Sequence, residues 1–250
     1  MNLLGQTILV TGATGAIGQA ICQALATDGA QVVIHYERNR DAAGTLLGSI
    51  QGRGWSIAAD LSNPGGAQKL WDAAVAVGSR ITGLVNNAGI RSEITVDAPM
   101  AEWQEVWERE MRVNFLSAVD LSKLAIQHFR DNGGGRIINM ASRAGQRGYA
   151  SNAMAYGASK AALINLTKSI AQSYGQEGIT SVALAPGWVR TAMADAYVAQ
   201  HGRAAVVSGI PIGAMAQPSE VGEIIAFVFR PSQASLNGAV LDVNGGSYLR

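Results

Sequence analysis

The stretch TILVTGATGAIG, residues 7–18, joins a short β-favouring run to a glycine-rich loop and the start of a helical pattern. Glycines in such a loop let the backbone approach a phosphate closely, and the helix N-terminus adds unpaired N–H groups and the positive end of its dipole. This order of elements predicts a site for the pyrophosphate of a dinucleotide. Its residues are Gly12, Thr14, Gly15, Ala16, Ile17 and Gly18. The alternative is a tight turn that only requires small residues.

Short β-branched runs alternate with helical patterns along the rest of the chain. We expect strands at residues 7–10, 31–35, 55–58, 83–85, 136–140, 180–184 and 240–243. Because these runs are almost continuously apolar, they are typical of central strands in a parallel sheet with helices on both faces. The prediction is one α/β domain over residues 1–250, a Rossmann-type, doubly wound parallel sheet of about seven strands. The less regular stretch 192–211 is the candidate substrate lid.

Composition excludes several classes of partner. The formal charge is +1, from 19 basic and 18 acidic residues, so we expect no nucleic-acid partner and no anionic lipid surface. Charged residues make up 15%, below the roughly 25% of average soluble domains, which favours a homo-oligomer with covered surfaces. The single cysteine, Cys22, the lack of a signal peptide and the lack of a membrane-spanning run favour a cytoplasmic protein. No metal-ligand spacing is present, so no metal site is predicted.

The end of the second expected strand bears on which dinucleotide would bind. An acidic residue often closes this strand and binds the ribose hydroxyls, but Tyr36 stands there. Arg38 could pair with a 2′-phosphate, while Glu37 keeps NAD open. The sequence therefore favours NADP(H) slightly over NAD(H). Alternatively, Glu37 and Arg38 are only a solvated pair of loop charges.

Tyr156 and Lys160 lie four residues apart in a helical segment, so both project from one helix face. An ammonium near a phenol stabilises the phenolate and lowers a pKa that is ordinarily about 10. The phenol could then exchange a proton with a substrate oxygen, and Ser142 could hydrogen-bond the same oxygen. Isolated Tyr-x-x-x-Lys pairs are mostly structural, so the position of this pair in the fold decides between a structural and a catalytic role.

The positions of these residues along the chain favour the functional interpretation. Gly12 to Gly18, Asn86 to Gly89, Ser142 and Pro186-Gly187 each follow an expected parallel strand. In an open α/β sheet the carboxyl ends of the strands form the ligand crevice. We therefore expect these residues and Tyr156 to converge on one site.

Together these residues resemble the short-chain dehydrogenase/reductase family over essentially the whole chain. The motifs, in order, are the glycine loop, Asp60-Leu61, Asn86-Asn87-Ala88-Gly89, Ser142 with Tyr156 and Lys160, and Pro186-Gly187-Trp188-Val189-Arg190-Thr191. The resemblance implies an NAD(P)-dependent oxidoreductase acting on a small-molecule carbonyl or alcohol, with Asn114, Ser142, Tyr156 and Lys160 as the catalytic set. It also implies that Asp60 contacts the adenine and that Val189 and Thr191 contact the nicotinamide carboxamide. The other implied cofactor-binding residues are Leu61, Asn87, Ala88, Gly89, Pro186 and Gly187.

One departure from the family pattern lies in the glycine loop, where Ala16 replaces the usual middle glycine and Gly15 supplies another spacing. Residues 210–213 and 236–246 most resemble 3-oxoacyl-carrier-protein reductases, which are NADPH-dependent homotetramers. Gln172 stands where such reductases often have an arginine, so sugar, polyol or steroid substrates stay open. A non-catalytic dinucleotide sensor on the same fold is the alternative of a different class.

Overall fold

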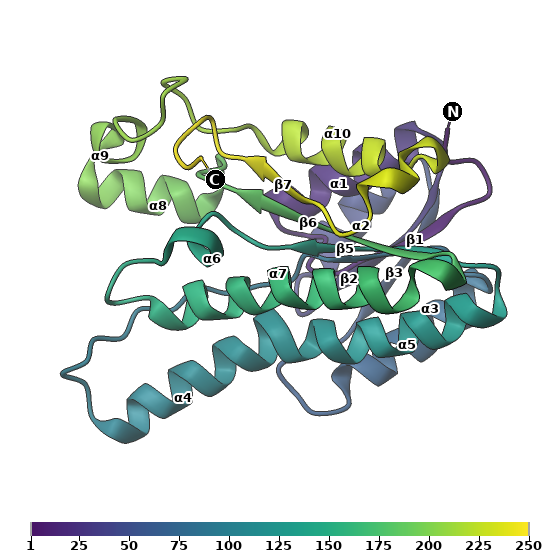
Figure 1. Ribbon diagram of the computed structural model, residues 1–250, viewed down its shortest axis with the longest axis horizontal. Coiled ribbons are helices and arrows are strands. Elements are labelled where there is room, and N and C mark those ends of the chain that lie inside the picture. Colours follow the sequence, from purple (N-terminus) through teal and green to yellow (C-terminus); the bar gives the residue numbers. More distant parts are fainter. Residues whose placement is uncertain (1, 250) are drawn as a thin grey trace.

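The computed structural model describes residues 2–249 and contains one seven-stranded sheet in the order β3-β2-β1-β4-β5-β6-β7 (Figure 1). Every neighbouring pair of strands is parallel. The strand order reverses between β1 and β4, where a doubly wound sheet opens its ligand crevice. The strands are β1 (Thr7–Val10), β2 (Gln31–Tyr36), β3 (Gly54–Ala58), β4 (Gly83–Asn86), β5 (Gly135–Met140), β6 (Ile179–Pro186) and β7 (Val240–Val243).

Helices cover both faces of this sheet (Figure 1). The α-helices are α1 (Ala16–Thr27), α2 (Arg40–Ser49), α3 (Gly66–Gly78), α4 (Met100–Met111), α5 (Ser117–Asp131), α6 (Ala144–Arg147), α7 (Met154–Tyr174), α8 (Ala192–His201), α9 (Arg203–Val207) and α10 (Pro218–Phe229). A π-helical segment, η1 (Arg112–Leu116), joins α4 to α5, and 3-10 segments η2 (Gly175–Glu177) and η3 (Pro231–Leu236) follow α7 and α10. No helix within residues 2–249 is long and apolar enough to cross a bilayer.

The alternation of side chains along each strand divides the core between the two faces. Ile8 and Val10 of β1 pack with α1, α2 and α10, whereas Leu9 between them packs with α3 and α5. All three are fully buried. Because both sides of the strand are covered, the sequence shows a continuous apolar run instead of an alternating one.

The expected strands and the fold class are confirmed, with strand ends that differ by no more than two residues. The prediction that all seven are central strands is wrong for β3 and β7, which form the two edges of the sheet. Their burial reflects this position, because the residues of β3 are half-buried or exposed and only Val240 of β7 is buried. Apolar content alone does not distinguish an edge strand from a central one.

Helices α1 and α10 pack closely because a glycine stands where they meet. A Cβ on Gly222 would lie 2.5 Å from the backbone oxygen of Ala20. That separation is closer than real Cβ contacts, so the two backbones would have to move apart. Gly44, on the exposed side of α2, has no neighbour within 4 Å of its added Cβ.

We therefore expect the same substitution to have opposite effects at these two sites. Gly222→Ala should lower the free energy of unfolding by about 1–3 kcal/mol through overpacking. Gly44→Ala should raise it by about 0.5–1 kcal/mol through helix propensity. Thermal and denaturant unfolding followed by circular dichroism measure both, and an equally stable Gly222→Ala protein would contradict the close packing.

Candidate active site

The loops after β1 and β4 are tied together by one buried threonine. The Thr11 hydroxyl donates to the carbonyl oxygen of Val85 and accepts from the backbone N–H groups of Asn87 and Ala88. The Asn87 amide group in turn donates to the carbonyl oxygens of Thr11 and Gly12. These bonds hold the glycine loop against the Asn86–Gly89 segment at the carboxyl edge of the sheet.

Two glycines of the first loop are sterically required. Gly12 has φ of +60°, and its Cβ would lie 2.9 Å from the Cα of Ala88. A Cβ on Gly18 would lie 2.4 Å from the backbone oxygen of Gly12. Gly15 meets only one atom, at 3.6 Å, and Ala16 begins α1 without strain, so the departure from the family pattern leaves the loop intact. The loop and the N-terminus of α1 thus form an open cradle that fits a pyrophosphate.

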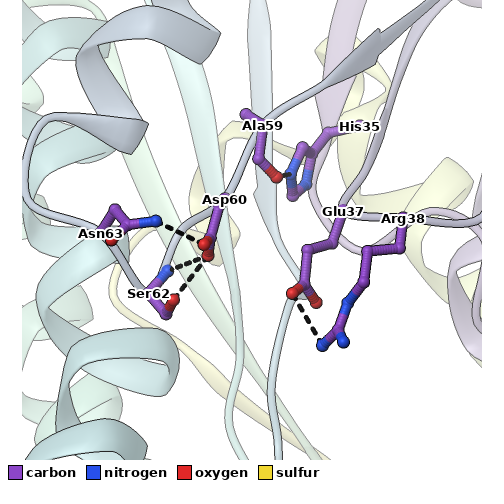
Figure 2. A network of polar contacts seen from close by, with 7 residues as sticks. All are labelled: His35, Glu37, Arg38, Ala59, Asp60, Ser62 and Asn63. Atoms are coloured by element: carbon purple, nitrogen blue, oxygen red, sulfur yellow. Dashed lines mark hydrogen bonds and ion pairs between the residues drawn. The ribbon is translucent and has the colours of Figure 1, made fainter.

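His35 is a site residue that the sequence analysis did not identify. It is 3% exposed, accepts from the Gly12 N–H at Nδ1 and donates from Nε2 to the Ala59 carbonyl oxygen (Figure 2). Burial lowers its pKa, so the imidazole is neutral, as these two bonds require. His35 thus links the glycine loop to the end of β3. A lone histidine in an apolar strand carries no signal of this role in the sequence.

Asp60 lies beside this histidine on the loop after β3. Its carboxylate accepts from the Ser62 backbone N–H at 2.8 Å, from the Ser62 hydroxyl at 2.6 Å and from the Asn63 amide (Figure 2). The bonds from Ser62 hold the pKa of Asp60 below its usual range. Asp60 and Leu61 both line the cavity, at the end where the sequence predicts the adenine.

At the end of β2, the side chains that line the cavity are not the ones that the sequence predicts. Tyr36 is 9% exposed and packs in the core with α1 and α2, so it does not line the cavity. Glu37 does line it, and its carboxylate holds the guanidinium of Arg38 at 2.9 Å (Figure 2). The Arg38 side chain is 79% exposed and does not contribute to the lining.

The opposite end of the cavity contains the tyrosine and lysine of α7. The Lys160 ammonium nitrogen lies 5.7 Å from the centre of the Tyr156 ring and donates to the Met140 carbonyl oxygen at 2.7 Å. Ser142, on the loop after β5, hydrogen-bonds Tyr156, and its Oγ also accepts from the Ala144 backbone N–H at 3.1 Å. Phenol, hydroxyl and ammonium therefore meet at one place, as the sequence predicts.

The expected lowering of the tyrosine pKa is wrong for the protein alone. Burial raises the pKa of Tyr156 to about 12, against which the hydrogen bond from Ser142 acts only in part. Burial also lowers the pKa of Lys160 to about 8, although the carboxylate of Glu110 opposes that change. Desolvation is the largest cause of both shifts because both groups lie away from water. Helical spacing brings them together but does not show how deeply they are buried.

Asn114 lies in the π-helical segment η1 and is 1% exposed. Its Oδ1 accepts from the Ile90 N–H at 2.7 Å, and its Nδ2 donates to the Ile90 carbonyl oxygen and to Ser159. A Cβ on Gly89 would lie 3.3 Å from the Lys160 nitrogen and 3.4 Å from Asn114 Oδ1. The two polar atoms therefore converge on Gly89, where a larger residue would have to displace them by a few tenths of an ångström. Single π-helical turns of this kind are frequent at functional sites.

The loop after β6 completes the cavity. The backbone of Val189 forms a bridge to Ala216, and Thr191 caps α8 by accepting from the Ala194 N–H at 3.3 Å. Helices α8 and α9 follow and lie where the arrows of β6 and β7 point in Figure 1. The stretch 192–211 is thus mainly helical, not irregular as its sequence indicates.

These elements enclose one continuous cavity of about 520 Å³. The predicted site residues that line it are Gly12, Thr14, Gly15, Ala16, Ile17, Gly18, Asp60, Leu61, Asn87, Ala88, Gly89, Ser142, Tyr156, Lys160, Pro186, Gly187, Val189 and Thr191. Three predicted residues do not line it: Tyr36, Arg38 and Asn114. Further lining residues that the sequence analysis did not identify as site residues include His35, Glu37, Arg91, Arg109, Arg143 and Tyr149.

Comparison with known proteins agrees with this geometry. Residues 6–202 match the family model for short chain dehydrogenase. The chain is 35% identical to a 3-oxoacyl-[acyl-carrier-protein] reductase FabG of Vibrio cholerae, covering all of both chains. It is also 35% identical to an acetoacetyl-CoA reductase of Allochromatium vinosum, over 98% of this chain and all of the relative.

Two solved structures share the fold. A 7α-hydroxysteroid dehydrogenase complexed with NADH and 7-oxo glycochenodeoxycholic acid matches with a TM-score of 0.88 and 28% identity, over 98% of this chain and 95% of that one. The angucycline C-6 ketoreductase LanV with bound NADP matches with a TM-score of 0.88 and 29% identity, over 98% and 96%. Fold, site and relatives therefore agree: the chain belongs to the short-chain dehydrogenase family and is an NAD(P)-dependent oxidoreductase of carbonyl or alcohol groups.

Proposed function

We propose that Tyr156, Ser142, Lys160 and Asn114 are the catalytic set and that the cavity binds a dinucleotide along its glycine loop. The observation that carries this proposal is the common cavity, with the anion cradle of Gly12 to Gly18 at one end and the Tyr156 phenol at the other. When bound, the nicotinamide supplies or accepts a hydride. The protein's own contribution is to orient the substrate oxygen and to move its proton.

The proton states of the set suit carbonyl reduction. With a pKa of about 12, the Tyr156 hydroxyl keeps its proton at neutral pH and can donate it to a developing alkoxide. Ser142 donates a second hydrogen bond to the same oxygen. Lys160, next to Asn114, is placed to return a proton to the phenol. Alcohol oxidation is the reverse and requires the phenol to lose its proton.

Replacing Tyr156 with phenylalanine tests its role as the acid. Tyr156→Phe removes only the hydroxyl, so turnover should fall by about 10² to 10⁴-fold while dinucleotide binding is retained. Tyr174→Phe is the matched control, because Tyr174 ends the same helix and does not line the cavity. Steady-state reduction of a carbonyl panel measures turnover, and calorimetry measures binding. Full activity in Tyr156→Phe would exclude the tyrosine, and a wild type that binds dinucleotide without any turnover would favour the sensor.

The pKa of Lys160 predicts a pH dependence. The amino group is cationic below about pH 8 and neutral above it, because burial depresses its pKa to that value. If the cation is needed, reduction at limiting dinucleotide should fall about tenfold per pH unit above pH 8. Arginine stays charged throughout this range, so Lys160→Arg should lose the inflection even where its rate is lower. An inflection that persists unchanged in Lys160→Arg would assign it to another group.

The choice of dinucleotide depends, we propose, on Glu37. The sequence favours NADP(H) through Arg38, but Glu37 lines the cavity and Arg38 does not. A carboxylate at this end accepts hydrogen bonds from a ribose diol and repels a 2′-phosphate. The ion pair with Glu37 also occupies the Arg38 guanidinium. This arrangement supports NAD(H) as the preferred dinucleotide.

Neutralising the carboxylate tests this preference. Glu37→Gln should shift the ratio of the two dissociation constants towards NADPH by about tenfold, because one charge repulsion is removed. Asp41→Asn, an exposed neutralisation on α2, is the control and should leave the ratio unchanged. Calorimetric titration with NADH and NADPH measures both. A wild type that binds NADPH more tightly, together with a selective loss of NADPH in Arg38→Ala, would restore the 2′-phosphate role of Arg38.

The substrate is, in its broad class, a small-molecule carbonyl or alcohol. The 35% sequence identity to the Vibrio reductase and to the acetoacetyl-CoA reductase supports reduction of a 3-oxoacyl thioester as a second, narrower candidate reaction. We propose that residues 192–211, which form α8 and α9, cover the substrate as a lid. Trp188 stacks on Tyr197 of α8 with ring centres 5.0 Å apart, which ties this lid to the loop after β6.

We propose a cytoplasmic homotetramer as the working form. The low charge content supports self-association, as do the exposed side chains of Val96, Met100 and Phe227. The assembly and the location both stay predictions.

A further inference from the structure

Arg143 directly follows Ser142 at the carboxyl end of β5 and is 8% exposed. It lines the cavity. Its backbone N–H donates to the Pro186 carbonyl oxygen at 2.9 Å, which fixes the residue between the loops after β5 and β6. A charged residue with so little exposed surface is usually paired with a carboxylate, because a largely buried charge without compensation is costly.

No such partner is present among residues 2–249. The ion pairs of this part of the chain do not include Arg143, and no hydrogen bond from its guanidinium occurs there. Burial and the positive charge of Arg147 both lower the pKa of Arg143, while the Tyr149 hydroxyl raises it. Arginine keeps its proton even so. The cavity therefore contains a permanent cation that the described residues do not neutralise.

The neighbouring arginine behaves differently. Arg91 also lines the cavity, but its guanidinium pairs with Glu93 at 2.8 Å and lies 5.5 Å from the centre of the Tyr149 ring. Its charge is therefore compensated within the protein. Arg143 is left as the group that needs an anion from outside.

Arg143 follows a different strand from the one that precedes the phosphate cradle. The phosphate cradle follows β1, and β4 separates β1 from the strand that ends before Arg143. Arg143 is instead next to Ser142 in the chain. Tyr149, whose hydroxyl interacts with Arg143, contacts Tyr156 with ring centres 5.5 Å apart and ring planes inclined by 51°. The uncompensated charge thus lies at the proton-donating end of the cavity.

We propose that Arg143 binds an anionic group of the substrate, a carboxylate or a phosphate, while Ser142 and Tyr156 bind the carbonyl oxygen of the same molecule. This inference rests on the proposed function and names the substrate class. The chemistry is unchanged: the carbonyl carbon gains a hydride from the reduced dinucleotide, which is oxidised, and the oxygen gains the proton of Tyr156. A planar fork of N–H donors suits both kinds of anion.

Matched substrates of different charge test the proposal. The panel is levulinate and acetoacetate with their methyl esters, dihydroxyacetone phosphate with dihydroxyacetone, and acetoacetyl-CoA, each reduced with NADH and with NADPH. Wild type should prefer the anion of at least one pair by about 10- to 100-fold in kcat/KM, as expected for a charge-assisted hydrogen bond. The carboxylate and phosphate pairs show which of the two anions is bound.

Arg143→Leu should abolish that preference, measured as the ratio of the two kcat/KM values within each pair, while Arg143→Lys should retain part of it. Arg147→Leu, four residues further on, exposed and outside the lining, is the matched control and should behave as wild type. A preference for the neutral member of every pair, or an anion preference that survives in Arg143→Leu, would overturn the proposal.

Binding measurements distinguish a failure of this inference from a failure of the proposed function. Calorimetry of the NAD⁺-loaded protein with levulinate, dihydroxyacetone phosphate and their neutral partners should show tighter binding of an anion, lost in Arg143→Leu. If no panel member is reduced but this difference appears, the anion subsite stands and the catalytic proposal fails. If reduction occurs with no difference between anions and neutral partners, the catalytic proposal stands and the subsite fails.

Discussion

The site depends on the parallel alignment of β1, β4, β5 and β6, because parallel strands end at the same edge of the sheet. Residues that are far apart in the chain therefore meet there. The Thr11 hydroxyl shows how closely, since it bonds both the end of β4 and the loop beyond it. On the catalytic side, the Arg143 N–H bonds the last residue of β6 in the same manner. The fixed spacing between the strands sets the distances between these loops, so the cavity is largely preformed.

Burial then sets the chemistry that this edge supports. The same removal from water raises the pKa of the Tyr156 phenol and lowers that of the Lys160 amine. Both shifts favour the uncharged forms of the two groups. For the phenol this is the protonated form, which is able to donate a proton to an alkoxide. The Tyr156 phenol therefore keeps its proton at neutral pH in the protein alone.

Charge is distributed unevenly along the cavity. At the end near the glycine loop, Glu37 and Asp60 present carboxylates, and Arg38 forms an ion pair with Glu37 outside the lining. At the catalytic end, Arg143 presents a cation without a partner among the described residues. A ligand that spans the site must match both ends. Our proposals assign recognition of the dinucleotide to the first end and recognition of the substrate to the second, so separate substitutions test the two specificities.

The order of strands and helices followed from the sequence, because apolar periodicity and the glycine loop are local features. So did the glycine cradle and the meeting of Ser142, Tyr156 and Lys160, because these residues follow expected strands and match the family motifs in order. Other properties needed the tertiary structure: the edge position of β3 and β7, the retreat of Tyr36 into the core, and the role of His35 between two loops. The burial of Tyr156 and the lack of an ionic partner for Arg143 among the described residues also needed the tertiary structure. Burial and pairing arise from contacts between distant segments, so no local pattern encodes the pKa of a phenol or an unpaired cation.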